Sequence, residues 1–170
     1  SKRIYANDII INALKKNEVT DTFIFSGGSI MPVIDKLYNN SINYKVNSHE
    51  QNCGHAATGY AKISGKPGVV MVTSGPGITN MVTPMLDATN DSTPLVVLSG
   101  QVSLNAVGTN AFQEAPAVKI TSNVTKWSYQ VQNMLELENV INKAFDIANT
   151  GKKGCVHIDI PKCVSSNSMK

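Results

Sequence analysis

The stretch "VVMVTSGPGITN", residues 69–80, decides the fold that the rest of the chain must follow. Residues 69–74 are nearly all apolar or β-branched, as expected for a strand that helices cover on both faces. The segment "GPG" follows directly and opens a helix that we expect to run through Leu86, because proline is tolerated in a first helical turn. A buried strand, a glycine turn and a helix form the repeating unit of a parallel α/β sheet.

The same unit recurs on both sides of this stretch. Strands are expected over residues 22–25, 44–46, 69–74, 94–100, 126–131 and 155–161. Helices are expected near residues 4–17, from residue 31, over 50–64 and over 137–148; residues 101–123 are expected to be irregular, with one helical turn near 112–118. Six strands alternating with helices predict a three-layer α/β/α fold around a mostly parallel six-stranded sheet.

The size and composition of the chain fit one globular domain. Its 170 residues are 42% hydrophobic and 16% charged, which is enough apolar surface for a single core. We expect this domain to cover residues 1–164, and the polar segment 165–170 to be a disordered tail or the start of a linker.

Charge and cysteine content narrow the class of function. The net charge is only +3, and lysine pairs such as Lys15-Lys16 lack interleaved aromatic residues, so we expect no nucleic-acid partner. No apolar run is long enough to span a bilayer, so we expect no membrane partner. The three cysteines are widely spaced, which indicates reduced thiols. The expected location is the cytoplasm, or an organelle if a targeting segment was removed.

Unusual residues follow three of the expected strands. Ligands of open parallel sheets bind beyond the carboxyl ends of the strands. The segments at these ends are "SGGS" (26–29), "HEQ" (49–51) and "SGPG" (74–77). We therefore expect the functional site where these three segments meet.

Two familiar motifs are only partly matched. "HEQNC" resembles the start of a zinc-protease helix, but position 53 is Cys, and His55 falls on the side of the helix opposite His49. No metal site is expected here. "GPGITN" resembles a dinucleotide-binding turn, but Asn80 replaces the third glycine and no acidic residue follows about twenty residues later. What remains is a backbone that a flat ligand can approach closely, beside the rigid face of Pro76.

Glu50 has two interpretations. An acid in the first turn of a helix is favoured by the helix dipole, whatever its function. The small residues that follow at helical spacing allow another helix to pack close, as in a tight helix pair or a dimer seam. They are Gly54, Ala57, Thr58 and Ala61. A carboxylate at the end of such a seam is shielded from water and suited to share a proton with a ligand nitrogen.

Three long segments together carry a family resemblance. They are "FSGGSIMPVIDKLY", "HEQNCGHAATGYAKISGKPGVVMVTSGPGITN" and "GQVSLNAVGTNAFQEAPAVKITSNVTKWSYQV". In this order they resemble the N-terminal pyrimidine-binding domain of thiamine-diphosphate enzymes, most closely acetolactate synthase large subunits. The likeness covers nearly the whole chain and implies the thiamine-diphosphate-binding fold. It departs from the family pattern at Ser26, Ser29 and Asn110, and the changes at Ser29 and Asn110 leave the substrate preference open.

The resemblance implies a catalytic role for Glu50. In the family, the matching glutamate hydrogen-bonds a ring nitrogen of the cofactor's aminopyrimidine and favours its imino tautomer, which then deprotonates the thiazolium carbon. The activated cofactor attacks a 2-keto acid such as pyruvate, carbon dioxide leaves, and the remaining fragment is joined to a second keto acid.

Other site residues are implied in the same way. The resemblance places the backbone of Gly27 and Gly28 near the cofactor, and the loop containing Gly75, Pro76 and Asn80 against its pyrimidine ring. It brings Phe112 and Gln113 to the reacting end, with Gln113 as a hydrogen-bonding partner of the substrate or intermediate. It also places Lys126 near the substrate entrance.

The resemblance further implies that this chain holds half of a site. No Gly-Asp-Gly segment for Mg²⁺ and the diphosphate occurs, so a diphosphate-binding domain of the full-length enzyme is an expected partner, and the fragment alone is expected to be inactive. FAD is a further candidate cofactor of the full-length enzyme. A homodimer through the helix of residues 54–61 is expected.

Two alternatives remain open. One is another thiamine-diphosphate decarboxylase or carboligase, such as glyoxylate carboligase or oxalyl-CoA decarboxylase. The other is a non-catalytic pairing module.

Overall fold

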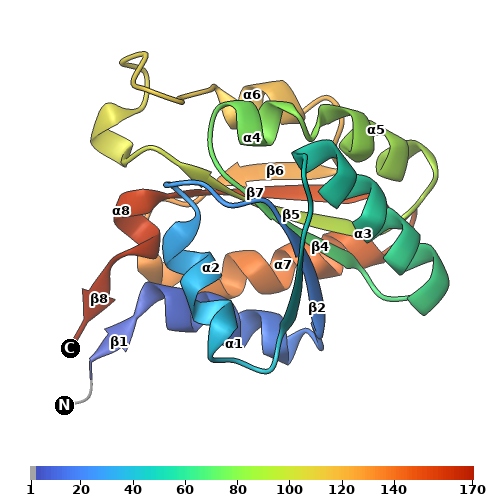
Figure 1. Cartoon of the computed structure of the whole chain (residues 1–170), viewed down its shortest axis with the longest axis horizontal. Coiled ribbons are helices and arrows are strands. Elements are labelled where there is room, and N and C mark those ends of the chain that lie inside the picture. The colour runs from blue at the N-terminus through green and yellow to red at the C-terminus, as the bar shows by residue number, and fades with distance from the viewer. Residues whose placement is uncertain (1–2) are drawn as a thin grey trace.

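A six-stranded, all-parallel sheet forms the middle layer of the molecule (Figure 1). The computed structural model describes residues 3–170. The strands lie in the order β3-β2-β4-β5-β7-β6. Their bounds are β2 Asp21–Ile24, β3 Asn43–Val46, β4 Gly68–Val72, β5 Leu95–Gln101, β6 Trp127–Gln130 and β7 Cys155–Pro161. The predicted three-layer α/β/α class is confirmed.

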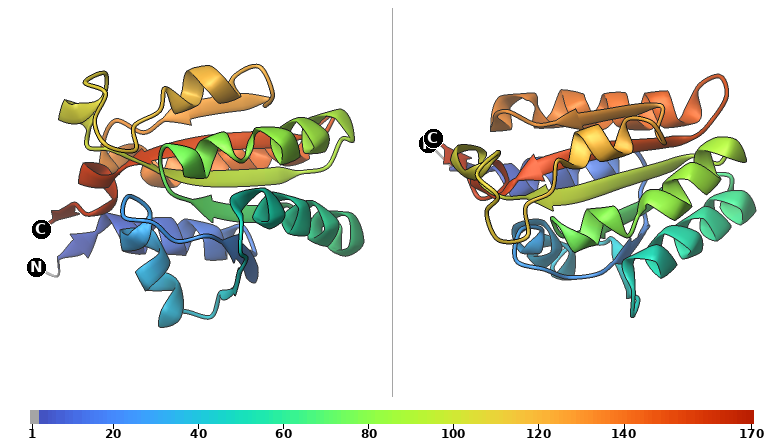
Figure 2. Two further views of the ribbon diagram at one scale, coloured as in Figure 1. Left: turned by 45° about the horizontal axis from the view of Figure 1, so that its top comes forward. Right: turned by 90° about the horizontal axis from the view of Figure 1, so that it is seen from above.

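Helices cover both faces of this sheet (Figure 2). One face packs against α1 (Ala6–Lys16), α2 (Met31–Tyr38) and α7 (Leu137–Asn149). The other packs against α3 (Glu50–Ser64), α4 (Pro76–Thr79), α5 (Val82–Asn90) and α6 (Ala117–Thr121). Short elements complete the chain: η1 Leu104–Ala106, η2 Met134–Glu136 and α8 Lys162–Ser165.

The central strand β4 shows why its sequence is apolar throughout. Val69 and Met71 are buried in the cluster beneath α1 and α7, whereas Val70 and Val72 are buried in the cluster beneath α3 and α5. Successive side chains of a strand point to opposite faces, so a strand covered on both faces needs apolar residues at every position. The two cores thus meet at a strand without a polar side.

The predicted helix from "GPG" through Leu86 is wrong in one respect, because it is two helices. α4 ends at Thr79, and Met81 donates a backbone hydrogen bond back to Ile78 instead of continuing the regular pattern. Pro84 has no N–H to donate to the carbonyl of Asn80, so the helical ladder is interrupted at that point. The break leaves Asn80 at a helix end, where its side chain is free to contact another element.

Two further expectations concern helix positions. Gly65 adopts φ +73° and ends α3, as predicted. The helical turn expected near residues 112–118 instead begins at Ala117, directly after Pro116 at the N-cap. A proline disfavours helical geometry at the residue before it, which is Ala115 here. The helix therefore starts after Pro116.

The C-terminal segment is ordered, which corrects the expectation of a disordered tail. β8 (Ser168–Met169) pairs antiparallel with β1 (Ile4–Tyr5), and Ala6 N donates to Asn167 O over 2.9 Å. Figure 1 shows β1 and β8 side by side. The polar tail is ordered because its backbone finds partners on β1, which composition does not reveal. The limit of the domain at residue 164 stays a prediction.

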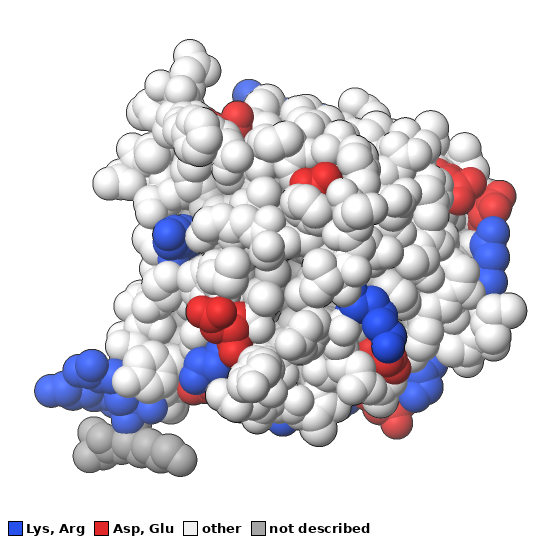
Figure 3. All heavy atoms as spheres, viewed as in Figure 1, with Lys and Arg blue, Asp and Glu red and all other residues white. Residues whose placement is uncertain are grey.

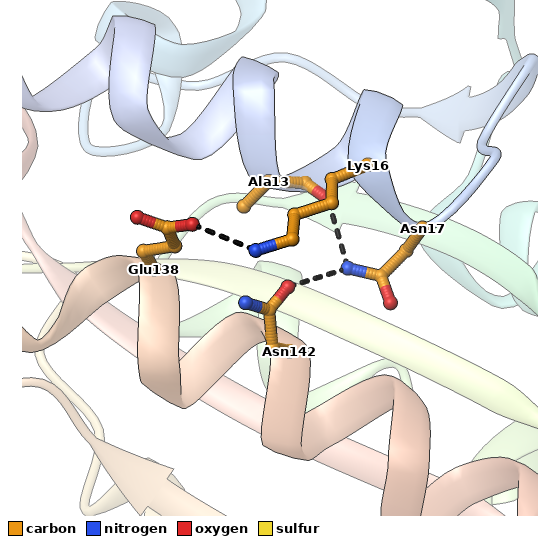
Figure 4. A network of polar contacts seen from close by, with 5 residues as sticks. All are labelled: Ala13, Lys16, Asn17, Glu138 and Asn142. Atoms are coloured by element: carbon orange, nitrogen blue, oxygen red, sulfur yellow. Dashed lines mark hydrogen bonds and ion pairs between the residues drawn. The ribbon is translucent and has the colours of Figure 1, made fainter.

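At the amino ends of the strands, α1 and α7 are joined by polar contacts (Figure 4). Lys16 pairs with Glu138 at 3.1 Å, and Asn17 Nδ2 donates to Asn142 Oδ1 and to Ala13 O, both over 2.8 Å. A cleft of about 480 Å³ opens here, lined in part by Asn17 and Asn142. It lies at the end of the sheet opposite the three predicted site segments.

The distribution of surface charge and the length of the helices concern nucleic-acid and membrane partners. On the face drawn in Figure 3, acidic and basic side chains are interspersed without a broad basic patch. Within residues 3–170, no helix combines the length and the apolar character needed to cross a bilayer.

Candidate functional site

The three predicted site segments meet at the carboxyl edge of the sheet. β3, β2 and β4 are neighbours and run parallel, so the residues after them emerge on one side. Residues 26–29 follow β2, residues 49–51 follow β3 and residues 74–77 follow β4. This juxtaposition agrees with the sequence-based expectation; the roles assigned to the individual residues remain predictions.

Glu50 lies at the first position of α3 and is only 7% exposed. Its Oε2 accepts a hydrogen bond from Asn80 Nδ2 over 3.0 Å. Within residues 3–170, this is the one hydrogen bond made to the carboxylate, so Oε1 is available for another partner. The helix dipole favours the negative charge here, but the bond from Asn80 fixes the carboxylate in one orientation.

His49 has a structural role beside Glu50. It is the N-cap of α3, and its Nδ1 accepts a hydrogen bond from Gln51 N over 3.0 Å. The imidazole is thereby engaged with the helix start. Within residues 3–170, no group of three or more His, Cys, Asp or Glu side chains is placed to hold a metal ion.

The loop after β4 requires glycine at position 75. Gly75 adopts φ +59° and ψ −116°, directly before Pro76 opens α4. A Cβ on Gly75 would lie 2.6 Å from the carbonyl oxygen of Gln113, closer than packing permits. The close approach therefore brings the turn containing Gln113 against the Gly75-Pro76 loop. Gln113 itself adopts φ +56°, and Phe112 beside it is 87% exposed.

Gly27 and Gly28 differ sharply in their surroundings. A Cβ on Gly27 would overlap the buried side chain of Thr73, so Gly27 is needed for packing of β2 against β4. Ser29 Oγ lies 2.9 Å from Thr73 Oγ1 and accepts a hydrogen bond from Ser74 N over 3.0 Å, which ties the two loops together. Nothing lies within 4 Å of a Cβ on Gly28. Gly28 is thus the glycine with open space beside its backbone.

The structure places Lys126 away from the position that the resemblance implies. The resemblance implies a place near the substrate entrance, but Lys126 precedes β6 at the amino end of the sheet, and its backbone N donates to Cys155 O at the start of β7. Its Nζ donates to Ile147 O, and to Thr150 O over 2.8 Å, near the C-terminus of α7. Parallel strands put this end of β6 opposite Glu50, so Lys126 is remote from the site.

Lys162 is a candidate that the sequence analysis missed. It is exposed and directly follows β7 at the carboxyl edge of the sheet. The rule that residues after strands line the site would have selected it.

The stripe of small residues on α3 is a helix pair within the chain. All four members, Gly54, Ala57, Thr58 and Ala61, are buried in α3. A Cβ on Gly54 would overlap Pro84 of α5. Within the chain, α5 and β4 cover this stripe, which fits the helix-pair interpretation; the homodimer through this helix stays a prediction. A dimer through α3 would have to use the opposite side of the helix, where Ile63 is 91% exposed.

Comparison with known proteins agrees with this geometry. Residues 4–120 match the family described as thiamine pyrophosphate enzyme, N-terminal TPP binding domain. The chain belongs to this family.

The relatives it resembles are acetolactate synthases. The chain is 50% identical over 159 residues to the mitochondrial acetolactate synthase catalytic subunit of Saccharomyces cerevisiae, covering 92% of the chain and 23% of the relative. It is 48% identical over 164 residues to the corresponding subunit of Aspergillus candidus, covering 96% and 24%. It is 44% identical over 153 residues to the acetolactate synthase isozyme 2 large subunit of Escherichia coli, covering 90% and 28%. The chain thus spans about a quarter of the length of these relatives.

Proposed function

We propose that this chain is the pyrimidine-binding part of an acetolactate synthase, a thiamine-diphosphate-dependent carboligase that decarboxylates pyruvate and joins the product to a second 2-keto acid. The names of the relatives support the reaction class. The observation that carries the proposal is Glu50, a nearly buried carboxylate at the carboxyl edge that is held through one oxygen only.

The residues at this edge fit the aminopyrimidine half of the cofactor. When bound, thiamine diphosphate supplies the nucleophilic carbon for attack on the keto group. Glu50 is suited to hold a proton or accept a hydrogen bond at Oε1, since Asn80 occupies Oε2. Pro76 offers a rigid apolar surface, and Gly28 leaves room beside its backbone. Gln113, seated on Gly75, is the candidate hydrogen-bonding partner for substrate.

The remaining parts of the active site are proposed to come from the rest of the full-length protein. These are the Mg²⁺ and diphosphate contacts, which in this proposal belong to a partner domain, and FAD where the enzyme uses it. A homodimer in which two chains complete each site is part of the proposal, as is the inactivity of the fragment alone.

The relatives also bear on location. The fungal relatives are named as mitochondrial subunits and others come from bacteria, so both an organelle and the cytoplasm stay proposed places of action.

Product analysis of the full-length enzyme tests the reaction. Incubation with thiamine diphosphate, Mg²⁺ and pyruvate alone is expected to accumulate acetolactate. Turnover of another acid without acetolactate would favour a sibling decarboxylase or carboligase. No turnover of any 2-keto acid, with the protein folded and the cofactor bound, would favour a non-catalytic module.

A further inference from the structure

A chain of buried polar side chains runs through the sheet next to the proposed site. His157 and Asp159 on β7 are buried, as are Ser99 and Gln101 on the neighbouring strand β5. Ser99 Oγ lies 2.6 Å from His157 Nε2 and donates to Asp159 Oδ1 over 2.7 Å. A group of this polarity in an apolar core is costly unless every member is satisfied, so its partners are informative.

The partners assign one consistent set of hydrogen positions. Ser99 uses its only proton on Asp159, so it must accept from His157 Nε2–H. The other imidazole nitrogen, Nδ1, then accepts from the hydroxyl of Thr121 at 2.7 Å. Burial lowers the pKa of His157 to about 3, which agrees with this neutral tautomer. Asp159 is the last member of this hydrogen-bonded series and acts as an acceptor.

Gln101 connects these buried polar side chains to the loop that contains Ala115. Its Nε2 donates to Asp159 Oδ2 over 3.0 Å and to the carbonyl of Ala115 over 3.1 Å, and its Oε1 accepts from Val102 N over 2.9 Å. A backbone carbonyl can only accept and a backbone N–H can only donate, so the orientation of the amide is fixed. Both amide protons and the oxygen are in use, and the side chain is only 1% exposed.

Ala115 is the end of the turn that carries Gln113. The start of that turn is held by Glu114, whose carboxylate accepts from Gly108 N and, over 3.1 Å, from Ala111 N. Gln113 lies between these two anchors in a left-handed conformation, with its carbonyl pressed against Gly75. This conformation is unfavourable for a residue with a side chain, so neighbouring contacts must maintain it.

We propose that Gln101 is a positioning residue for Gln113: its buried amide, oriented by Asp159, fixes the carbonyl of Ala115 and thereby holds the Gln113 turn against Gly75. This inference rests on the proposed function, in which Gln113 reaches the substrate. Gln101 does not itself contact substrate. Gln101 ties the exposed loop that carries Gln113 to the buried side chains of the sheet.

The test uses the full-length enzyme with Gln101→Met, which keeps the side-chain length but removes both donors and the acceptor. We expect kcat to fall by between about tenfold and a hundredfold, as for displacement of a positioned group by about 1 Å. Deuterium exchange at the thiazolium carbon should be unchanged, because neither Glu50 nor Asn80 is hydrogen-bonded to Gln101. A general loss of structure would instead lower both rates.

Gln130→Met is the matched control. Gln130 Nε2 also donates to Asp159 Oδ2, over 3.1 Å, and its backbone carbonyl accepts from Gln132 Nε2 over 3.0 Å. Within residues 3–170, the Gln130 side chain makes no hydrogen bond to the Gln113 turn. This variant should retain kcat even if it lowers the thermal midpoint. Should Gln101→Met not yield folded enzyme, Gln101→Asn retains the amide but is too short to bridge Asp159 and Ala115, and the same kinetic pattern is expected.

A double-mutant cycle separates this inference from the proposed function. In a Gln113→Ala background, Gln101→Met should cause no further fall in kcat, because the group it positions is gone. If Gln113→Ala lowers kcat and the Gln101→Met effect is fully additive, the positioning role is wrong while the proposed function stands. If Gln113→Ala leaves kcat unchanged, both the role of Gln113 and the inference built on it are wrong.

Discussion

Asn80 donates a hydrogen bond from its Nδ2 to Oε2 of Glu50 over 3.0 Å, joining the end of α4 to the start of α3. The contact exists because α4 stops at Thr79 and leaves Asn80 as its C-cap. It gives the carboxylate a fixed orientation with one oxygen free. Several expectations follow from this arrangement and from the loops around it.

Replacing Asn80 with Ala should leave the fold intact and slow deuterium exchange at the thiazolium carbon of the full-length enzyme. A hydrogen bond to a charged group contributes about 1.5–3 kcal/mol, so the exchange rate should fall by about ten- to a hundredfold if Glu50 must be held for the reaction. Thr79→Ala is the control, since within residues 3–170 that hydroxyl donates a hydrogen bond only to Pro76 O, in its own helix. Equal exchange rates in the wild type and Asn80→Ala would show that the orientation of Glu50 does not matter.

Glu50→Gln should have a larger effect on the same exchange reaction. A correctly placed acid or base typically contributes about 10²–10⁴-fold, so we expect a fall of at least about a hundredfold with unchanged circular dichroism in the far ultraviolet. Glu138→Gln provides the comparison, because it also removes an acid from the first turn of a helix, here one that packs on the opposite face of the sheet. If the two variants have the same exchange rate, Glu50 only stabilises the start of α3 through the helix dipole.

The adjacent glycines should respond in opposite ways to alanine. Gly27→Ala forces a Cβ into Thr73, so the free energy of unfolding should fall by about 1–3 kcal/mol, as for other overpacked sites. Gly28→Ala has open space and should leave the unfolding midpoint nearly unchanged, yet weaken cofactor binding by the full-length enzyme. Urea unfolding and titration with thiamine diphosphate and Mg²⁺ measure the two effects. Normal cofactor affinity in Gly28→Ala would remove Gly28 from the proposed site.

Stability should fall on acidification because of His157. Burial lowers its pKa from 6.5 to about 3, so between these values the unfolded chain binds more protons than the folded chain. The cost is absent above pH 6.5 and grows as pH falls, by up to about 1.4 kcal/mol per pH unit. Burial raises the pKa of Asp159, which acts in the opposite direction. The measurement is therefore the difference between wild type and His157→Gln.

Urea unfolding at pH 7.5 and pH 5 should show the wild type losing more stability than His157→Gln. The Asp159 contribution is largely common to both proteins and drops out of the difference. Parallel losses in the two proteins would mean that His157 is not the group that titrates.

Residues 1–170 alone should bind thiamine diphosphate weakly. The proposed site here covers only the aminopyrimidine half, and charged contacts to the diphosphate would supply much of the binding free energy. Calorimetry with the cofactor and Mg²⁺ should give at best weak heat. Submicromolar binding by this fragment would contradict the proposal that a second domain completes the site.

Local sequence patterns determined much of the architecture. The apolar run of β4 predicted burial on both faces, and Gly65 predicted the end of α3, because these depend on side-chain period and on backbone freedom at one residue. The order of strands and glycine turns was sufficient to place three segments at one edge of a parallel sheet. The positions of Glu50 and Gly75 near that edge could therefore be predicted without knowing their partners, whereas the place of Gln113 was implied only by the family resemblance.

What the tertiary structure alone decided is which groups meet. The sequence marked Asn80 as a site residue but not as the donor to Glu50, and it did not distinguish the packing glycine, Gly27, from the open one, Gly28. The small stripe on α3 fitted a dimer seam as well as a helix pair, and only the structure showed that α5 covers it within the chain. A pattern along the chain records how much a residue is buried and which conformations it permits; the identity of its neighbour depends on strand register and helix packing between segments that lie far apart in sequence.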